Sequence, residues 1–399
     1  MIEVYEAEKA IERFAFKASV ERVHILHAKG RILAEDITAD RAGPPFNRVA
    51  MDGIGVAYAS LQTSQTLICE GMQAAGMAKL CLKHSMSGCL EVMTGAVLPE
   101  NCDTVIPFEK ITQENESYRI NDPKEVVQGQ NIHRFASDYE VGSVLLKKNI
   151  EISTPAIAVL ASEGYEYVSV KTNPKFAILT TGSELVGIAE KPLIHQIRMS
   201  NIYAAHACLE KFCIEEKDRY HLDDDREATF KKVKELLETY DVLILSGGVS
   251  KGKKDYVPEV LTELGVEKVF HKIKQKPGKP MFFGVVDDKR VFALPGNPVS
   301  MLVCMIRYVL PWLNLSHKEQ FASEGVVCLK DSIRPKEKLT LFAPVKLSID
   351  DTGKRVANKI SVNGSGDFNA LTESTGFIEV PTGIEEIPAG MLFPYYSWE

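Results

Sequence analysis

Three short segments rich in glycine, serine and proline carry residue types that bind anions. They are TTGSEL (180–185), SGGVSKGKKD (246–255) and PGNPVS (295–300). Each ends or follows a short apolar run that predicts a buried strand, and the carboxyl ends of parallel strands form the ligand crevice of an open α/β sheet. Backbone amides in glycine-rich turns, together with serine hydroxyls, bind phosphates and related oxyanions. The spacing matches neither GxGxxG nor GxxxxGK[ST], so neither a dinucleotide site nor a P-loop is indicated.

A lysine-rich segment, KIKQKPGKP at 272–280, brings positive charge to the same region. Lysine side chains are compact point charges that suit phosphates and oxyanions. On their own, the glycine-rich segment could be a plain βα turn and the lysine-rich segment a solvated charge run. The apolar MFFGVV that follows the lysines favours a strand entry facing the crevice. The candidate anion-binding residues of these two segments are Gly247, Gly248, Ser250, Lys272, Lys276 and Lys279.

Three carboxylates accompany the predicted strand ends. Glu184 lies in the first segment, Asp224 lies at the start of a predicted helix, and Asp255 closes the second segment. Any one of them is more often a helix N-cap than a ligand. Three carboxylates beside a lysine run predict a Mg²⁺ site that bridges a phosphate. The combination indicates chemistry on a phosphorylated, anionic substrate.

The elements that must position these residues alternate between strands and helices from about residue 173. Apolar runs at 176–181, 241–245 and 291–294 predict strands, and segments with helical spacing lie between them and after Pro298. This alternation predicts a doubly wound α/β domain with a parallel sheet. For the helix expected over 299–310, Asn297 is the expected N-cap and Pro298 fits the first turn.

Short β-like runs flank this α/β region on both sides. Between about 54 and 130 they are QTLICEG, CLEVMTG, DTVIPFEKI, ESYRIND and KEVVQGQN, which predict a small β-barrel or sandwich. After Pro311, the runs LTLFAPVKLSI and GFIEVPTG predict a second β domain. Helical spacing over 3–14 predicts an amphipathic N-terminal helix that docks on another part of the chain.

The net charge of the 399-residue chain is −7, but it is unevenly distributed. Residues 251–280 hold eight lysines and four carboxylates, so the remaining 369 residues carry −11. This balance excludes a surface that coats nucleic acid, but not a small polyanion in a cleft. Eight cysteines without a CxxC pair predict reduced thiols of an intracellular protein. Without a signal-like N-terminus or a spanning apolar stretch, we expect a cytoplasmic protein with no membrane partner.

Seven motifs stand in the order in which one known family carries them. They are PPFNRVAMDG (44–53), TGAVLPENCDTVIPFE (94–109), GQNIHRFASD (129–138), TTGSEL (180–185), SGGVSKGKKD (246–255), KPGKP (276–280) and LPGNPVS (294–300). Over about residues 44–300 the chain thus resembles the MoeA-type molybdopterin molybdenumtransferases, the family that includes the gephyrin E domain. The resemblance implies insertion of molybdate into adenylyl-molybdopterin with release of AMP, the final step of molybdenum cofactor biosynthesis. It also implies Mg²⁺ as the cation and a homodimer.

The pattern of predicted strands and helices, together with the resemblance, implies an α/β multidomain protein. It comprises a doubly wound molybdopterin-binding α/β domain, an elongated linking region and two small β domains. The N-terminal helix is expected at 1–20, packed on the α/β domain. The other expected boundaries are 21–45 with 134–170 for a discontinuous linking and dimerisation domain, 46–133 for the first β domain, 171–312 for the α/β domain and 313–399 for the C-terminal β domain.

The resemblance also assigns roles to residues of this chain. The implied catalytic set is Asp52, Thr94, Asp224, Asp255, Lys272 and Lys276, of which Asp52 and Thr94 would act on the partner subunit's site. The implied metal ligands are Glu184, Asp224 and Asp255. The implied substrate-binding residues are Gly247, Gly248, Ser250, Lys279, Pro295, Pro298 and Ser365.

One departure from the family pattern concerns the metal site. Ser183 stands where the family usually has aspartate, which removes one acidic group near the predicted metal. The alternative functions are a molybdopterin adenylyltransferase or related pyrophosphate-cleaving enzyme of the same fold, and a non-catalytic scaffold. The MDG and TGA blocks, which a stand-alone adenylyltransferase lacks, favour the transferase. A transient contact with such an adenylyltransferase is a further expectation.

Overall fold

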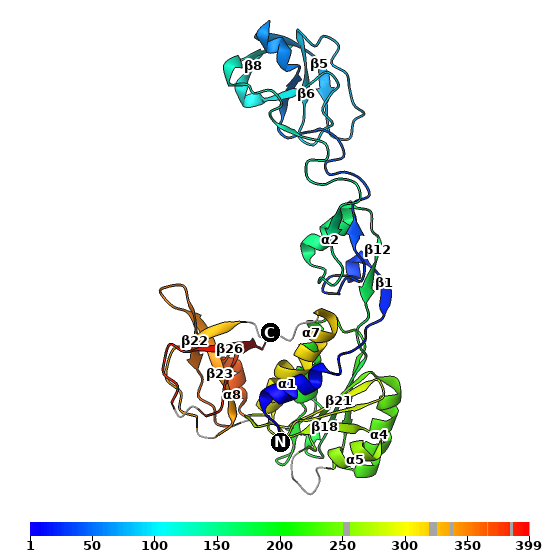
Figure 1. Ribbon diagram of the computed structural model, residues 1–399, viewed down its shortest axis with the longest axis vertical. Helices are drawn as coiled ribbons and strands as arrows, with labels where there is room; N and C mark the ends of the chain where they lie inside the picture. The colour runs from blue at the N-terminus through cyan, green and yellow to red at the C-terminus, as the bar shows by residue number, and fades with distance from the viewer. Residues whose placement is uncertain (250–255, 319–324, 336–337, 365, 384–385, 399) are drawn as a thin grey trace. The chain divides into compact units, whose positions relative to one another are not determined.

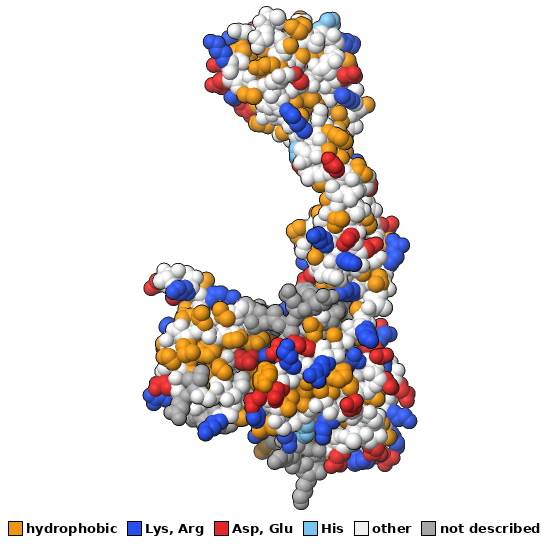
Figure 2. Space-filling view, viewed as in Figure 1, with side chains coloured by type: hydrophobic (Ala, Val, Ile, Leu, Met, Phe, Trp, Pro, Cys, Tyr) orange, Lys and Arg blue, Asp and Glu red, His pale blue; other side chains and the backbone are white. Residues whose placement is uncertain are grey.

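The computed structural model describes residues 1–249, 256–318, 325–335, 338–364, 366–383 and 386–398. The chain forms two compact units (Figure 1). The first unit comprises residues 1–34, 149–153 and 167–399, and the second comprises 35–148 and 154–166. Lys and Arg side chains are interspersed with Asp and Glu on the face shown in Figure 2.

The first unit contains a six-stranded sheet in the order β16-β13-β17-β21-β20-β18. Its strands are β13 (Phe176–Thr181), β16 (Lys217–Leu222), β17 (Val242–Ser246), β18 (Glu267–His271), β20 (Phe282–Val286) and β21 (Lys289–Leu294). The first four strands in this order are mutually parallel, whereas β20 and β18 are antiparallel to their neighbours. The expectation of a parallel sheet was therefore wrong for this edge. The cause is a two-residue turn between β20 and β21, where Asp287 has φ +47° and closes a hairpin.

Alternate residues of each central strand feed two separate cores, as expected for a sheet covered on both faces. In β13, Phe176 and Ile178 pack with α1 (Val4–Glu12), α3 (Asn201–Glu210) and α6 (Pro298–Cys304). Ala177 and Leu179 pack instead with α4 (Arg226–Thr239) and α5 (Val257–Glu263). Asp225 caps α4 by accepting a hydrogen bond from the Ala228 N–H at 2.7 Å.

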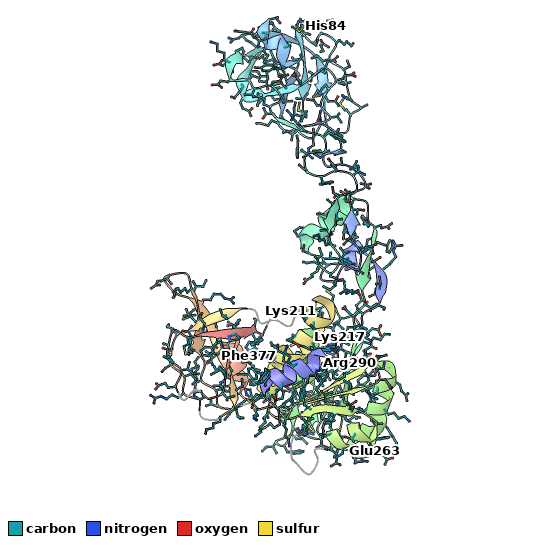
Figure 3. The ribbon with its side chains drawn as sticks, in the orientation of Figure 1. His84, Lys211, Lys217, Glu263, Arg290 and Phe377 are labelled. Atoms are coloured by element: carbon teal, nitrogen blue, oxygen red, sulfur yellow. The ribbon has the colours of Figure 1, made fainter. Side chains whose placement is uncertain are left out.

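The N-terminal helix α1 lies beside α7 (Leu310–Lys318) and buries its apolar face in the first of these cores (Figure 1). The segment after α1 is held by side chains of the α/β domain. Arg290, labelled in Figure 3, donates to the carbonyls of Phe14 and Ala15 at 2.8 and 3.2 Å. The Trp312 indole N–H also donates to the Phe14 carbonyl at 2.8 Å.

The apolar helix after Pro298 is longer than expected and is not regular. It runs through α6, a π-helical turn at Met305–Val309 and α7 (Leu310–Lys318). Asn297 occupies the N-cap position, but its side chain makes no capping bond. Within the described residues, Pro298–Leu315 is the only helical segment long and apolar enough to cross a membrane, and 72% of it is buried inside the protein. That burial is typical of a core helix.

The C-terminal part of the first unit is a β domain, as expected. Its sheet has the order β19-β23-β24-β22-β26-β25, and α8 (Phe368–Glu373) accompanies it. The strands are β19 (Gln275–Lys276), β22 (Val326–Leu329), β23 (Thr340–Ile349), β24 (Arg355–Lys359), β25 (Gly376–Val380) and β26 (Leu392–Ser397). Phe377, labelled in Figure 3, stacks on Tyr396 with ring centroids 5.1 Å apart. Strand β19 belongs to the lysine-rich segment and pairs with β23, so the α/β and C-terminal domains share a sheet.

The first unit also contains an antiparallel pair, β1 (Val20–His24) with β12 (Tyr167–Lys171), and a short parallel pair, β14 (Leu185–Val186) with β15 (Ile197–Arg198). The second unit contains α2 (Thr154–Ser162) and two short antiparallel pairs. These are β2 (Ile37–Thr38) with β11 (Val144–Leu146), and β3 (Arg48–Val49) with β10 (Ile132–His133).

The main element of the second unit is a six-stranded sheet of order β7-β4-β6-β5-β9-β8. Its strands are β4 (Gly53–Val56), β5 (Thr66–Gln73), β6 (Gly88–Val92), β7 (Thr104–Pro107), β8 (Ile111–Glu114) and β9 (Ser117–Ile120). Four of the five expected β runs supply β5, β6, β7 and β9, whereas β4 lies outside all of them and β8 begins only at the last residue of one. The fifth, KEVVQGQN, was predicted wrongly: it contains no strand and overlaps a 3₁₀ turn at Pro123–Glu125, because Pro123 and the capping side chain of Asp122 start that turn.

Candidate active site

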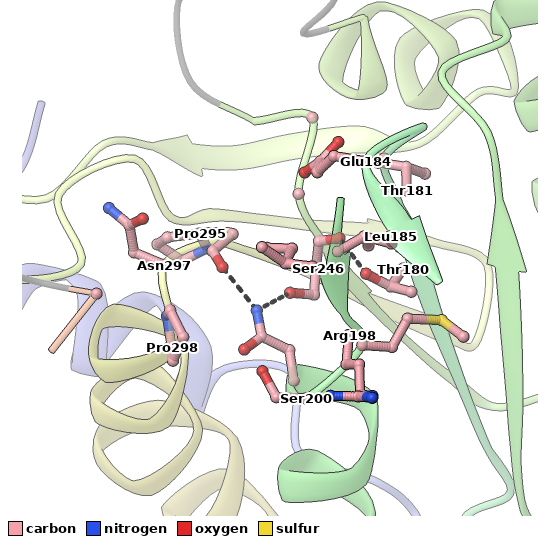
Figure 4. A pocket seen from close by; sticks show the side chains of 18 of the residues that line it. Thr180, Thr181, Glu184, Leu185, Arg198, Ser200, Ser246, Pro295, Asn297 and Pro298 are labelled. Atoms are coloured by element: carbon pink, nitrogen blue, oxygen red, sulfur yellow. Dashed lines mark hydrogen bonds between the residues drawn. The ribbon is translucent and has the colours of Figure 1, made fainter. Parts of the chain in front are cut away.

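A cleft of about 950 Å³ lies at the carboxyl ends of β13, β17 and β21. The three segments singled out in the sequence all contribute to its lining, as Figure 4 shows for Thr181, Ser246 and Pro295. The charged side chains among its described lining residues are Glu184, Asp224 and Arg198. The cleft therefore combines charged side chains with glycine-rich turns that present backbone groups. We call this cleft the mixed pocket.

The glycine turn after β17 depends on conformations that favour glycine. Gly247 and Gly248 have φ of +100° and +67°. A Cβ on Gly247 would lie 2.8 Å from the Thr181 carbonyl oxygen, and one on Gly248 would lie 2.6 Å from a Val257 methyl group. Both glycines line the mixed pocket. Their backbone can approach a bound anion closely because there is no side chain in the way.

Glu184 and Asp224 line the same pocket and sit on adjacent turns. The hydroxyl of Ser183 accepts a hydrogen bond from the Asp224 N–H at 3.0 Å, which links the two turns directly. His221 lies 3.1 Å from the Gly182 carbonyl oxygen and supports the first turn from β16. Ser183 thus joins the two turns without a negative charge of its own. The oxygen donors of Glu184 and Asp224 are of the kind that Mg²⁺ prefers, so this pair fits the predicted metal.

Asn201, at the start of α3, is a pocket residue that the sequence analysis missed. Its amide nitrogen donates to the Ser246 hydroxyl and to the Gly296 carbonyl, both at 2.8 Å (dashed in Figure 4). One side chain therefore ties the ends of β17 and β21 together. The only sequence signal was the dipeptide Ser200–Asn201 at the start of a helical pattern, which reads as an N-cap.

A second cleft, of about 890 Å³, lies between the lysine-rich segment and the C-terminal β domain. Its charged lining residues are all cationic: Lys276, Lys279, Arg334 and Lys359. No aspartate or glutamate occurs among the described residues that line it. We call it the cationic groove. It shares Pro280, Pro295 and Asn297 with the mixed pocket, so the two clefts adjoin.

Several predicted residues are brought together and one is not. Lys276, Lys279 and Pro295 line the cationic groove, while Pro295 and Pro298 line the mixed pocket. Lys272 lines neither cleft; it has φ +75° and its N–H donates to the Met281 carbonyl at 2.8 Å. Ser250, Asp255 and Ser365 lie outside the described residues.

Asp52 and Thr94 belong to the second compact unit, where they contact each other. The carboxylate of Asp52 accepts hydrogen bonds from the Thr94 N–H at 2.6 Å and from the Thr94 hydroxyl at 2.7 Å. These bonds, the backbone one first, hold the pKa of Asp52 below its ordinary value. The MDG and TGA motifs thus form one local unit with an ionised carboxylate.

Three family profiles match successive parts of the chain. Residues 2–164 match the family profile "MoeA N-terminal region (domain I and II)", residues 177–315 match "Probable molybdopterin binding domain", and residues 326–398 match "MoeA C-terminal region (domain IV)". The chain is 41% identical to a molybdopterin molybdenumtransferase of Synechocystis over 92% of this chain and 93% of that one. It is 32% identical to one of Haemophilus influenzae over 96% and 95%.

The fold has solved counterparts. A crystal structure of a molybdopterin biosynthesis MoeA protein from Pyrococcus horikosii matches with a TM-score of 0.81 and 28% identity, covering 100% of this chain and 99% of that one. A second MoeA structure, from Pyrococcus horikoshii OT3, matches with a TM-score of 0.73 and 26% identity over the full length of both chains.

Proposed function

The chain belongs to the MoeA family of molybdopterin molybdenumtransferases, and from that premise we propose that it inserts molybdate into adenylyl-molybdopterin, with release of AMP, across its two adjoining clefts. The mixed pocket takes the adenylylated pterin and the cationic groove takes molybdate. The observation that carries this division is the contrast in charge between two clefts that share Pro280, Pro295 and Asn297.

The cationic groove suits molybdate because the charged side chains among its described lining residues all have one sign. A tetrahedral dianion needs several positive groups and no facing carboxylate, which is the lining that Lys276, Lys279 and Lys359 supply. Arg334 also lines the groove and pairs with Glu386 at 2.9 Å, which offsets part of its charge. The groove therefore depends chiefly on its lysines.

The mixed pocket suits a phosphoanhydride. The amide of Gly248 provides a donor for phosphate oxygens, while the Gly247 N–H donates to the Leu294 carbonyl at 3.2 Å and holds the turn. Asn201 holds this turn against the Gly296 turn. Glu184 and Asp224 would hold Mg²⁺, with Asp255 as the third ligand that the resemblance implies. A cation bound there would supply positive charge against the phosphate oxygens and a site for an ordered water.

The proposal includes a homodimer in the cytoplasm. The resemblance implies that Asp52 and Thr94 act at the partner subunit's site, and the low pKa of Asp52 keeps that carboxylate ionised. Delivery of the adenylylated substrate by a transient contact with an adenylyltransferase is part of the same proposal. A monomer mass by light scattering at micromolar concentration would contradict the dimer.

The experiment that tests the division of substrates between the clefts compares one variant of the cationic groove with one variant of the mixed pocket. Lys276→Ala should raise the KM for molybdate about tenfold with little change in the KM for adenylyl-molybdopterin, because it removes one ammonium from the groove. Glu184→Ala should lower kcat for AMP release about 100-fold, because it removes a metal ligand. Lys346→Ala, an exposed lysine on β23 outside the groove, is the matched control. A Lys276→Ala enzyme with wild-type molybdate dependence would reject the groove assignment.

The alternative of an adenylyltransferase has no observation in its favour. Profiles of the MoeA N-terminal and C-terminal regions match residues on both sides of the α/β domain.

A further inference from the structure

A buried polar cluster lies directly beneath the loop that carries Lys276 and Lys279. Gln275, Cys304 and Tyr308 are all completely buried. The Tyr308 hydroxyl donates to the Gln275 side-chain oxygen. The Gln275 side-chain nitrogen donates to the Pro277 carbonyl at 3.1 Å and contacts the Cys304 sulfur at 3.7 Å. The thiol of Cys304 in turn lies 3.7 Å from the Gly278 carbonyl oxygen.

This cluster leaves the loop little freedom. Gly278 has φ +88°, and a Cβ there would lie 2.5 Å from the Gln275 side-chain nitrogen and 2.7 Å from the Cys304 sulfur. The loop therefore rests against the cluster with no spare space. A fully satisfied buried network of this kind specifies one conformation, whereas a broken one leaves buried polar atoms without partners.

The π-helical turn explains how one helix reaches both walls of the cationic groove. Tyr308 and its neighbour Arg307 both lie in this turn, and Tyr308 points to the lysine loop through Gln275. Arg307, which is 4% exposed, donates to Glu379 of β25 and to Glu8 of α1, both at 2.8 Å. The same turn thus fixes the loop on one side of the groove and the C-terminal sheet on the other. Turns of this type occur often at functional sites.

We propose that Tyr308 is a positioning residue for the cationic groove: through Gln275 it fixes the loop so that Lys276 and Lys279 bind the same oxyanion. The proposal rests on the assignment of the groove to molybdate made above. It makes no use of Tyr308 as a contact of the substrate, since the side chain is completely buried. Loss of its hydroxyl should weaken oxyanion binding while the chemistry of the mixed pocket continues.

The test is Tyr308→Phe, which keeps the ring and removes only the hydroxyl. The matched control is Tyr240→Phe: Tyr240 is 7% exposed, and its hydroxyl bonds Asp218 and, at 2.8 Å, Tyr220, on the strand at one edge of the main sheet. Calorimetric titration with molybdate alone measures binding, thermal unfolding measures stability, and steady-state kinetics separate KM from kcat. Tyr308→Phe should weaken molybdate binding about fivefold and raise its KM with kcat within about twofold. Tyr240→Phe should lower the midpoint temperature of thermal unfolding by a similar amount and bind molybdate like wild type.

Gly278→Ala is a second test of the same loop, for the case in which Tyr308→Phe does not fold. This substitution pushes the same loop away from the cluster, because the new Cβ would lie 2.5 Å from the Gln275 side-chain nitrogen, and it should also weaken molybdate binding. The inference is overturned if Tyr308→Phe folds and binds molybdate like wild type while Lys276→Ala does not. If Tyr308→Phe does not fold, wild-type binding by Gly278→Ala overturns it. If Lys276→Ala and Lys279→Ala also bind like wild type, the groove assignment itself fails, and the inference fails with it.

Discussion

Asn201 provides a sharp test of how the mixed pocket is held together, and the change is Asn201→Ala. Its amide nitrogen makes two hydrogen bonds of 2.8 Å, to the Ser246 hydroxyl and the Gly296 carbonyl. The reverse amide orientation would set oxygen against the Gly296 carbonyl, so the donor assignment follows from chemistry. A suitable control is Asn173, whose amide nitrogen also makes two hydrogen bonds, in this case to the carbonyls of Phe212 and Cys213 at 3.2 and 3.0 Å.

The expected magnitude follows from these contacts. Two hydrogen bonds at about 1 kcal/mol each give a loss of about 2 kcal/mol. The Asn201 side-chain oxygen is buried and has no partner among the described residues, so removing it returns part of that loss. If the full 2 kcal/mol appears in the transition state, kcat/KM for AMP release falls about 30-fold, and a drop of about 10- to 30-fold is the expected result.

The assay measures AMP release at saturating molybdate beside a thermal unfolding curve for each variant. Asn173→Ala should lose comparable stability, because it removes the same kind of bridge, but its side chain precedes β13 at the opposite end from the pocket. Its kcat/KM should stay within about twofold of wild type. The reasoning is refuted if Asn201→Ala is destabilised while its kcat/KM matches that of Asn173→Ala.

Three further changes test other parts of the structure. Burial lowers the pKa of His271 below its ordinary 6.5, so the folded chain binds this proton less tightly than the unfolded chain. The free energy of unfolding should therefore be constant in this respect above pH 6.5 and fall as the pH drops below it. His271→Gln should flatten that fall in unfolding curves measured at several pH values. Gly53→Ala places a Cβ 2.0 Å from the Ile106 carbonyl oxygen and should destabilise the second unit by about 3 kcal/mol, so an unchanged thermal midpoint would contradict this packing. Arg307→Met leaves two carboxylates facing each other without their cation and should cost about 3–5 kcal/mol in denaturant unfolding, whereas a neutral effect would show that the ion cluster is dispensable.

The pattern of apolar residues predicted helices and strands well where neighbouring residues in the sequence determine which face is buried. The apolar run 241–245 corresponds to β17 at Val242–Ser246, and the helical spacing over 3–14 corresponds to α1 at Val4–Glu12. The antiparallel edge of the main sheet was not predicted because its turn, Asp287–Asp288, contains neither the Asn-Gly nor the Asp-Gly pair that usually signals a two-residue hairpin. The π-helical turn could not be read from spacing, because it depends on where Arg307 and Tyr308 find partners distant in the sequence.

The candidate site was predicted in part, for a similar reason. Glu184 follows a predicted strand and Asp224 starts a predicted helix, and both line the cleft at the carboxyl ends of the parallel strands. Arg334 and Lys359 were missed because they reach the groove through the pairing of β19 with β23, which joins segments far apart in the chain. Lys272 belongs to the same lysine-rich segment as the groove lysines, but it is not among the residues that line either cleft.

The most direct test of the central claim is the dependence of AMP release on molybdate. Purified protein is incubated with adenylyl-molybdopterin and Mg²⁺ while molybdate is varied, and AMP and active molybdenum cofactor are measured together. The account predicts AMP release that rises with molybdate and saturates, with cofactor formed in equal amount. AMP release that is indifferent to molybdate, with no active cofactor formed, would contradict it.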